Sequence, residues 1–110
     1  MACYNGTIIP NFMEALGLTN IREHSSGSNG YIYLFWSFED AMNCYRRYKD
    51  ILLTMEFSLH EVRINGGDIC HVYSSGKELC FIDTHVPGDL LDEYGAKGIV
   101  VVSLNSTTTG

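Results

Sequence analysis

Residues 30–53 read GYIYLFWSFEDAMNCYRRYKDILL, an apolar run that leads directly into a segment with helical spacing. Residues 31–36 are uninterruptedly apolar and rich in residue types that favour strands. With a period of two, this strand would present two apolar faces, Tyr31, Tyr33 and Phe35 on one, and Ile32, Leu34 and Trp36 on the other. Such a strand is either covered on both faces or leaves an aromatic face for a partner. We expect the rings of residues 31–35 to fill the interior.

The segment after the strand is predicted to be the core helix. Ser37 is a suitable N-cap, and Asp40 lies three positions later in a weak version of the capping box. Apolar side chains then recur at helical spacing, as Phe38, Ala41, Met42, Tyr45, Tyr48 and Leu52. The pattern predicts a helix over about 38–53 that buries this stripe.

Turn signals divide the N-terminal third into shorter elements. Pro10 and Gly17 bound a short helix over about 10–16, because proline suits a first helical turn and glycine suits a C-terminal stop. Residues 18–24 are predicted to form a strand, although their alternation is weak. Residues 25–30, SSGSNG, are turn-forming throughout and are expected to close a hairpin onto the strand 31–36.

The C-terminal half predicts hairpins and one short helix. The strand 56–64 changes phase along its length, so we expect a bulge near His60–Glu61. A turn over residues 65–68, NGGD, joins it to a strand at 69–74, and a tight turn at Ser75–Gly76 leads to a strand at 78–83. That register would place His71 opposite Cys80. A short acidic helix follows Pro87 and ends at Gly95, before an apolar strand at 99–104.

These elements predict an α+β fold in a single domain over residues 1–110. We expect one mainly antiparallel sheet of five or six strands, with the helix 38–53 packed across it and two short helices beside it. From residue 30 onward the chain has the elements for a ferredoxin-like β-α-β-β-α-β path with one hairpin elaborated. Residues 105–110 are expected to form a frayed tail.

Composition restricts the possible partners. The formal net charge is −6, from 13 acidic and 7 basic residues. A binder of the phosphate backbone needs lysine and arginine, so no direct nucleic-acid contact is expected, whereas a basic protein surface is a suitable partner. No segment is long enough to span a membrane. The four cysteines lack disulfide spacing, and no secretory signal is visible, so a cytoplasmic location is expected.

The densest acidic group lies around the last predicted helix. It consists of Asp83, Asp89, Asp92 and Glu93. Such a group usually forms a solvated helix face, and its functional interpretation is an anionic patch that binds a basic groove on another protein.

Residues 29–41, NGYIYLFWSFEDA, resemble the third strand and the following helix of RNA recognition motifs. In that family, rings on the strand stack on bases. The resemblance implies that Tyr31 and Tyr33 would be the stacking residues of an RNA-binding, single-strand-binding or small-ligand-binding sheet. Asn29 stands where the family has a basic residue.

A third hypothesis is a small enzyme. Cysteine, histidine and aspartate gather within 16 residues, as Cys70, His71, Cys80, Asp83 and His85. A thiol beside a histidine can form a nucleophilic site, here His71, Cys80 and His85. None of the residue pairs has the spacing of a zinc site, so we expect no metal and no cofactor. Packing is the usual role of a buried thiol beside a hairpin histidine, so the sequence predicts no catalytic residue.

In size and charge the chain resembles the small acidic inhibitors, anti-CRISPR proteins among them, that phages encode against host nucleic-acid machinery. The resemblance implies a non-catalytic protein-binding module. Its acidic surface would occupy a basic groove on a nuclease or nucleoprotein effector, in place of guide RNA or DNA.

Overall fold

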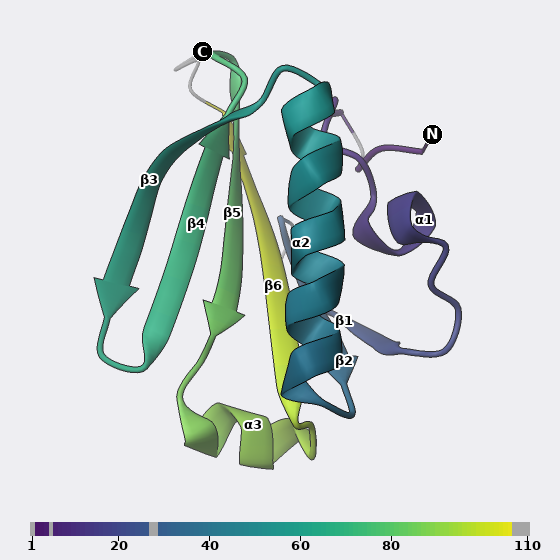
Figure 1. Cartoon of the computed structure of the whole chain (residues 1–110), viewed down its shortest axis with the longest axis vertical. Helices are drawn as coiled ribbons and strands as arrows, with labels where there is room; N and C mark the ends of the chain where they lie inside the picture. Colours follow the sequence, from purple (N-terminus) through teal and green to yellow (C-terminus); the bar gives the residue numbers. More distant parts are fainter. Residues whose placement is uncertain (1, 5, 27–28, 107–110) are drawn as a thin grey trace.

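The computed structural model describes residues 2–4, 6–26 and 29–106. These residues form one antiparallel six-stranded sheet in the order β1-β2-β6-β5-β4-β3, together with three helices (Figure 1). In chain order the elements are α1 (Phe12–Leu16), β1 (Arg22–Ser26), β2 (Gly30–Phe35), α2 (Phe38–Thr54), β3 (Ser58–Asn65), β4 (Asp68–Ser74), β5 (Glu78–His85), α3 (Gly88–Tyr94) and β6 (Gly98–Ser106). The predicted α+β class, the single antiparallel sheet and the long helix packed across it are confirmed.

The helix α2 begins as its sequence predicts. The Ser37 hydroxyl accepts a hydrogen bond from the Asp40 backbone N–H at 3.0 Å, which satisfies one free donor of the first turn. The helix then packs on β2, β6 and β5. Gly98, the first residue of β6, makes this approach possible. A Cβ atom there would lie 2.7 Å from the Ser37 carbonyl oxygen and 2.9 Å from the Ala41 Cβ.

The larger core lies between α2 and the sheet. Tyr33, Tyr48 and Leu52 are fully buried there. The N-terminal segment completes this core, because the Phe12 ring stacks on the Tyr33 ring with centroids 4.6 Å apart. The Tyr48 hydroxyl donates a 2.6 Å hydrogen bond to the Pro10 carbonyl, so the segment is fixed by polar as well as apolar contacts.

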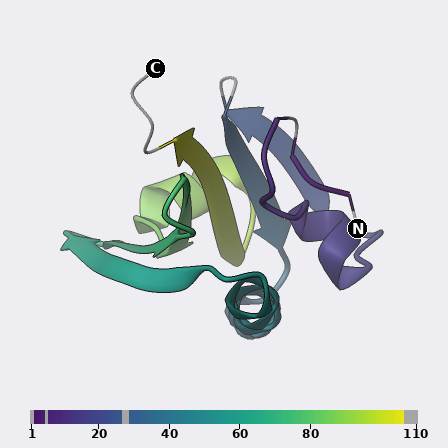
Figure 2. The same ribbon diagram turned by 90° about the horizontal axis from the view of Figure 1, so that it is seen from above.

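A smaller core lies on the opposite face of the sheet, under α3. Ile32 and Leu34 of β2 and Ile99 of β6 are buried there, packed against Leu90, Leu91 and Tyr94 of α3. Figure 2 shows α2 and α3 on opposite sides of the sheet. The strand β2 is therefore covered on both faces. The prediction that residues 31–35 fill the interior is confirmed for residues 32–35, whereas Tyr31 is partly exposed.

Several predicted boundaries change near the N-terminus. The helix α1 begins at Phe12, because the side chain of Asn11 caps it by accepting a hydrogen bond from the Glu14 N–H. The first strand begins at Arg22 rather than at residue 18. The reason is that the Leu18 N–H bonds to the Met13 carbonyl in the C-cap that Gly17 initiates, so its backbone closes the helix instead of pairing in the sheet.

The path from residue 30 is not ferredoxin-like. A ferredoxin-like unit connects parallel strands through each helix. Here α3 connects β5 to β6, which are antiparallel neighbours, and three other strands separate β2 from β3. The predicted tail also begins later, since Asn105 and Ser106 pair with β5 as part of β6, while residues 107–110 lie outside the described residues.

The bulge predicted in β3 is confirmed, and the predicted register of the next hairpin is wrong. The register of β3 against β4 shifts between Leu59 and Glu61. In the β4–β5 hairpin, His71 lies opposite Ile82, and Tyr73 lies opposite Cys80. The turn is longer than predicted, because Ser75 and Glu78 close it through both backbone and side-chain hydrogen bonds.

Among the described residues, no helix is long and apolar enough to cross a membrane.

Candidate functional site

Three of the four predicted acidic residues project from α3. Asp89, Asp92 and Glu93 are exposed and lie at helix positions i, i+3 and i+4, which share one face of a helix. The opposite side of α3 carries Leu90, Leu91 and Tyr94, which pack on the sheet. The three carboxylates therefore point away from the sheet into solvent.

The fourth acidic residue, Asp83, has a different environment. It lies in β5, directly opposite Cys70 of β4 and Val101 of β6, and is only partly exposed. Burial raises the pKa of its carboxyl group above the usual range, and a hydrogen bond with the Cys70 thiol opposes that shift. Asp83 belongs to the sheet surface rather than to the carboxylate face of α3.

The two histidines of the enzyme hypothesis meet around one threonine. The buried Thr84 hydroxyl lies 3.3 Å from His71 Nε2 and 3.1 Å from His85 Nδ1. The Tyr45 ring of α2 stacks on His71 with centroids 4.8 Å apart. Burial lowers the pKa of His71, and the neighbouring His85 lowers it further. Both effects shift the His71 ring toward its neutral form.

Cys80 does not join the histidines as a nucleophile. Its side chain is fully buried, and burial raises the pKa of its thiol to about 12. A reactive cysteine needs an accessible thiolate, and here the thiol stays protonated near neutral pH. The structure therefore contradicts the nucleophilic role considered for Cys80. In the described part of the chain, no group of three histidine, cysteine, aspartate or glutamate side chains is arranged to hold a metal ion.

The two candidate base-stacking tyrosines are engaged inside the protein. Tyr33 is fully buried, its ring lies against Phe12, and its hydroxyl bonds to the Tyr4 hydroxyl. Tyr31 is partly exposed, but its ring stacks on the Tyr4 ring with centroids 4.4 Å apart. The Tyr33 ring cannot receive a base in this fold, which contradicts the base-stacking role considered for it.

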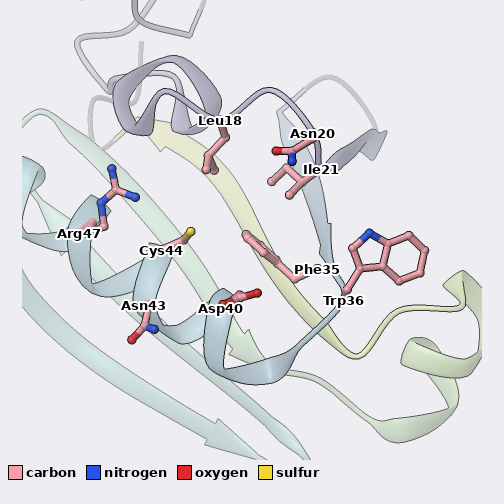
Figure 3. A pocket seen from close by; sticks show the side chains of 9 residues that line it. All are labelled: Leu18, Asn20, Ile21, Phe35, Trp36, Asp40, Asn43, Cys44 and Arg47. Atoms are coloured by element: carbon pink, nitrogen blue, oxygen red, sulfur yellow. The ribbon is translucent and has the colours of Figure 1, made fainter.

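A pocket of about 340 Å³ lies where β2 ends and α2 begins (Figure 3). Phe35 and Cys44 form part of its apolar wall, and burial raises the pKa of the Cys44 thiol. Figure 3 shows Leu18 and Ile21 of the α1–β1 connection facing α2 across the pocket. The polar lining residues come from that connection and from α2, namely Asn20, Asp40, Asn43 and Arg47.

The sequence pattern predicts no pocket here and includes Trp36 as the last residue of the strand 31–36. Trp36 follows the last residue of β2 and is 69% exposed, and the Arg22 guanidinium lies 5.4 Å from the centroid of its ring. The position of Trp36 directly before Ser37 could have indicated that its side chain leaves the sheet. A residue directly before an N-cap lies where the chain leaves the strand, so alternation no longer determines its direction.

In the comparisons with known proteins, no family model, curated protein or solved structure matches this chain.

Proposed function

We propose that this protein is a non-catalytic protein-binding module whose partner presents a basic surface. The observation that carries the proposal is the face of α3 formed by Asp89, Asp92 and Glu93, hereafter the α3 acidic face. These carboxylates are exposed on a helix whose other side is anchored to the sheet. A rigidly held group of like charges attracts and orients a partner of opposite sign.

No ion pair between described residues neutralises the α3 acidic face, although the Arg22 side chain donates a 3.0 Å hydrogen bond to the Tyr94 carbonyl at the end of α3. Between described residues the ion pairs are Lys49–Asp50 and Glu61–Arg63, and neither involves α3. No basic residue lies in the last turn of α3. With a net charge of −6 on the whole chain, the α3 acidic face adds to a general negative potential.

The more specific proposal concerns the kind of partner. A groove that binds guide RNA or DNA is lined by lysine and arginine, because it must neutralise phosphates. An acidic protein that fills such a groove inhibits the effector without any chemistry of its own. The size and charge of this chain support an inhibitor of a nuclease or nucleoprotein effector, of the kind that anti-CRISPR proteins represent.

Charge reversal tests the proposal. The variant Asp89→Lys/Asp92→Lys/Glu93→Lys should lose the partner captured from host lysate by the wild-type protein. The matched control, Glu14→Lys/Glu39→Lys/Asp50→Lys, changes net charge equally at exposed positions away from α3 and should retain it. Equal capture by both variants, or capture only of proteins that do not handle nucleic acid, would contradict the proposal.

The pocket beside Trp36 supports a second candidate function, the binding of a small ligand. Its volume of about 340 Å³ lies within the range of known ligand pockets, and it combines an apolar wall with polar side chains. Trp36 is the only tryptophan in the chain, so its fluorescence reports directly on the pocket. A metabolite screen in which no compound changes this fluorescence would remove the candidate.

A further inference from the structure

The strand β3 is the exposed edge of the sheet. It is the last strand in the sheet order, and all eight of its residues are exposed. Figure 1 shows β3 on the outer side of β4, away from α2. One side of its backbone therefore presents unpaired N–H and C=O groups, which is the usual template for adding another strand.

The bulge in β3 gathers its apolar side chains on one face. Leu59 lies opposite Tyr73, Val62 opposite His71 and Ile64 opposite Ile69, and these β4 residues alternate regularly along one face of the sheet. Without the extra residue, Leu59 would point to the other side. The result is an apolar row, Leu59, Val62 and Ile64, whose side chains are 52%, 43% and 73% exposed.

The opposite face of β3 carries a balanced pair of charges. Glu61 Oε1 lies 2.8 Å from Arg63 Nη2, and the Arg63 guanidinium lies 5.3 Å from the centroid of the Phe81 ring. These are the only formal charges in β3, so the edge is neutral although the chain carries −6. Two acidic molecules can approach each other along this edge without the repulsion present elsewhere.

We propose that β3 pairs antiparallel with β3 of a second copy of this chain, about a twofold axis centred on Val62. The pairing would join two six-stranded sheets into one continuous sheet across the dimer. Edge pairing of this kind is isologous, since each copy contributes the same surface.

The charges favour this register over the two neighbouring ones. A twofold axis perpendicular to the sheet keeps every side chain on its own face of the sheet. The axis must therefore lie midway between the two copies of a single residue, which then face each other across the interface. Centring on Glu61 or on Arg63 brings two like charges directly together, which is unfavourable. Centring on Val62 places Glu61 of each copy opposite Arg63 of the other and sets the two Val62 side chains side by side.

The same register explains why the occupant is a second copy rather than another protein. The segment Glu61-Val62-Arg63 is complementary to itself when reversed. Both apolar rows also meet on the α2 face, where they form one continuous strip. The edge of β3 is therefore complementary to the same edge of a second copy in three respects, namely its unpaired backbone groups, its charges and its apolar row.

The test is the oligomeric state of charge variants, measured by sedimentation over a range of protein concentrations. The wild-type protein should show a concentration-dependent dimer. Glu61→Arg and Arg63→Glu should each weaken the dimer by roughly tenfold, because each introduces two like-charge pairs per dimer. The double variant Glu61→Arg/Arg63→Glu should recover it, and an equimolar mixture of the two single variants should form heterodimers.

A cross-link tests the register independently. Directly opposed Cα atoms in an antiparallel pair lie about 4.5–5.5 Å apart, within disulfide range. In a Cys3→Ser background, Val62→Cys should form a disulfide-linked dimer on oxidation. Ile64→Cys should not, because His60 is the extra residue of the bulge and Ile64 would therefore face Leu59 of the second copy.

All the substituted side chains are exposed, so each variant should fold. Circular dichroism of each variant checks that a lost dimer does not reflect a lost fold. A wild-type protein that stays monomeric at millimolar concentration would overturn the proposal. So would a dimer unaffected by the single charge variants, or a double variant that fails to recover it. The α3 acidic face is not involved, so this outcome is independent of the proposed function.

Discussion

Gly98→Ala is the sharpest test of how α2 meets the sheet. The added Cβ would lie 2.7 Å from the Ser37 carbonyl oxygen, 2.9 Å from the Ala41 Cβ and 3.0 Å from the Phe38 Cα. These atoms belong to the backbone or sit directly on it, so no side-chain rotation can make room. The first turn of α2 must move away from β6 as a unit.

Overpacking of this kind typically costs about 1–3 kcal/mol, and three simultaneous close contacts place Gly98→Ala near the upper end of that range. For a domain of this size, the melting temperature should fall by roughly 4–8 °C for each kcal/mol. Urea unfolding followed by circular dichroism measures the change directly as a lower midpoint.

Gly88→Ala is the matched control. Gly88 begins α3, no atom lies within 4 Å of the position its Cβ would occupy, and alanine favours a helix more than glycine does. Its unfolding free energy should stay the same or rise. A Gly98→Ala protein within about 0.5 kcal/mol of wild type, the scatter of ordinary surface substitutions, would refute the claim that this glycine sets the distance between α2 and β6.

Three further predictions concern buried or partly buried polar groups. Tyr48→Phe removes the 2.6 Å bond to the Pro10 carbonyl and leaves that buried acceptor unpaired, so urea unfolding should show a loss of about 1–3 kcal/mol. The pKa of His71 is lowered in the fold from 6.5, so the unfolded chain binds the proton more readily, and stability should fall as pH drops through and below 6.5. His71→Phe should reduce this slope in urea titrations between pH 7 and pH 5, and an unchanged slope would assign it to other groups. Cys80, whose thiol pKa is raised to about 12, should resist iodoacetamide near neutral pH until the protein unfolds, whereas the exposed Cys3 should react, as mass spectrometry can show. Rapid labelling of Cys80 in the folded protein would reopen the thiol hypothesis.

Local signals were sufficient for most of the secondary structure. The cap at Ser37, the stop at Gly17 and the phase change in β3 each depend on residues within one turn or one strand of each other. Capping and bulge formation are local events, so the sequence contains the information that decides them. The interior position of Tyr33 and Phe35 followed in the same way, from an uninterrupted apolar strand.

Two boundary predictions failed because of short-range backbone hydrogen bonds that hydrophobic periodicity does not reveal. The Leu18 backbone closes α1 instead of joining β1, and the turn at residues 75–78 is longer than a two-residue hairpin. The candidate sites, in contrast, depended on contacts between segments that are distant in the sequence. His71 and His85 approach the same Thr84 hydroxyl because β4 and β5 pair in the observed register, which places Cys80 opposite Tyr73 rather than opposite His71.

The sequence by itself determined the α+β class, the covered strand 31–35, the long helix and the acidic character, because periodicity, capping and charge are properties of neighbouring residues. Only the tertiary structure decided the strand order, the pocket beside Trp36, the separation of Asp83 from the α3 acidic face and the exposed edge at β3. The physical reason is that strand order and edge exposure depend on which distant segments pair, and pairing energies are too similar among apolar strands for one strand's pattern to select its neighbour.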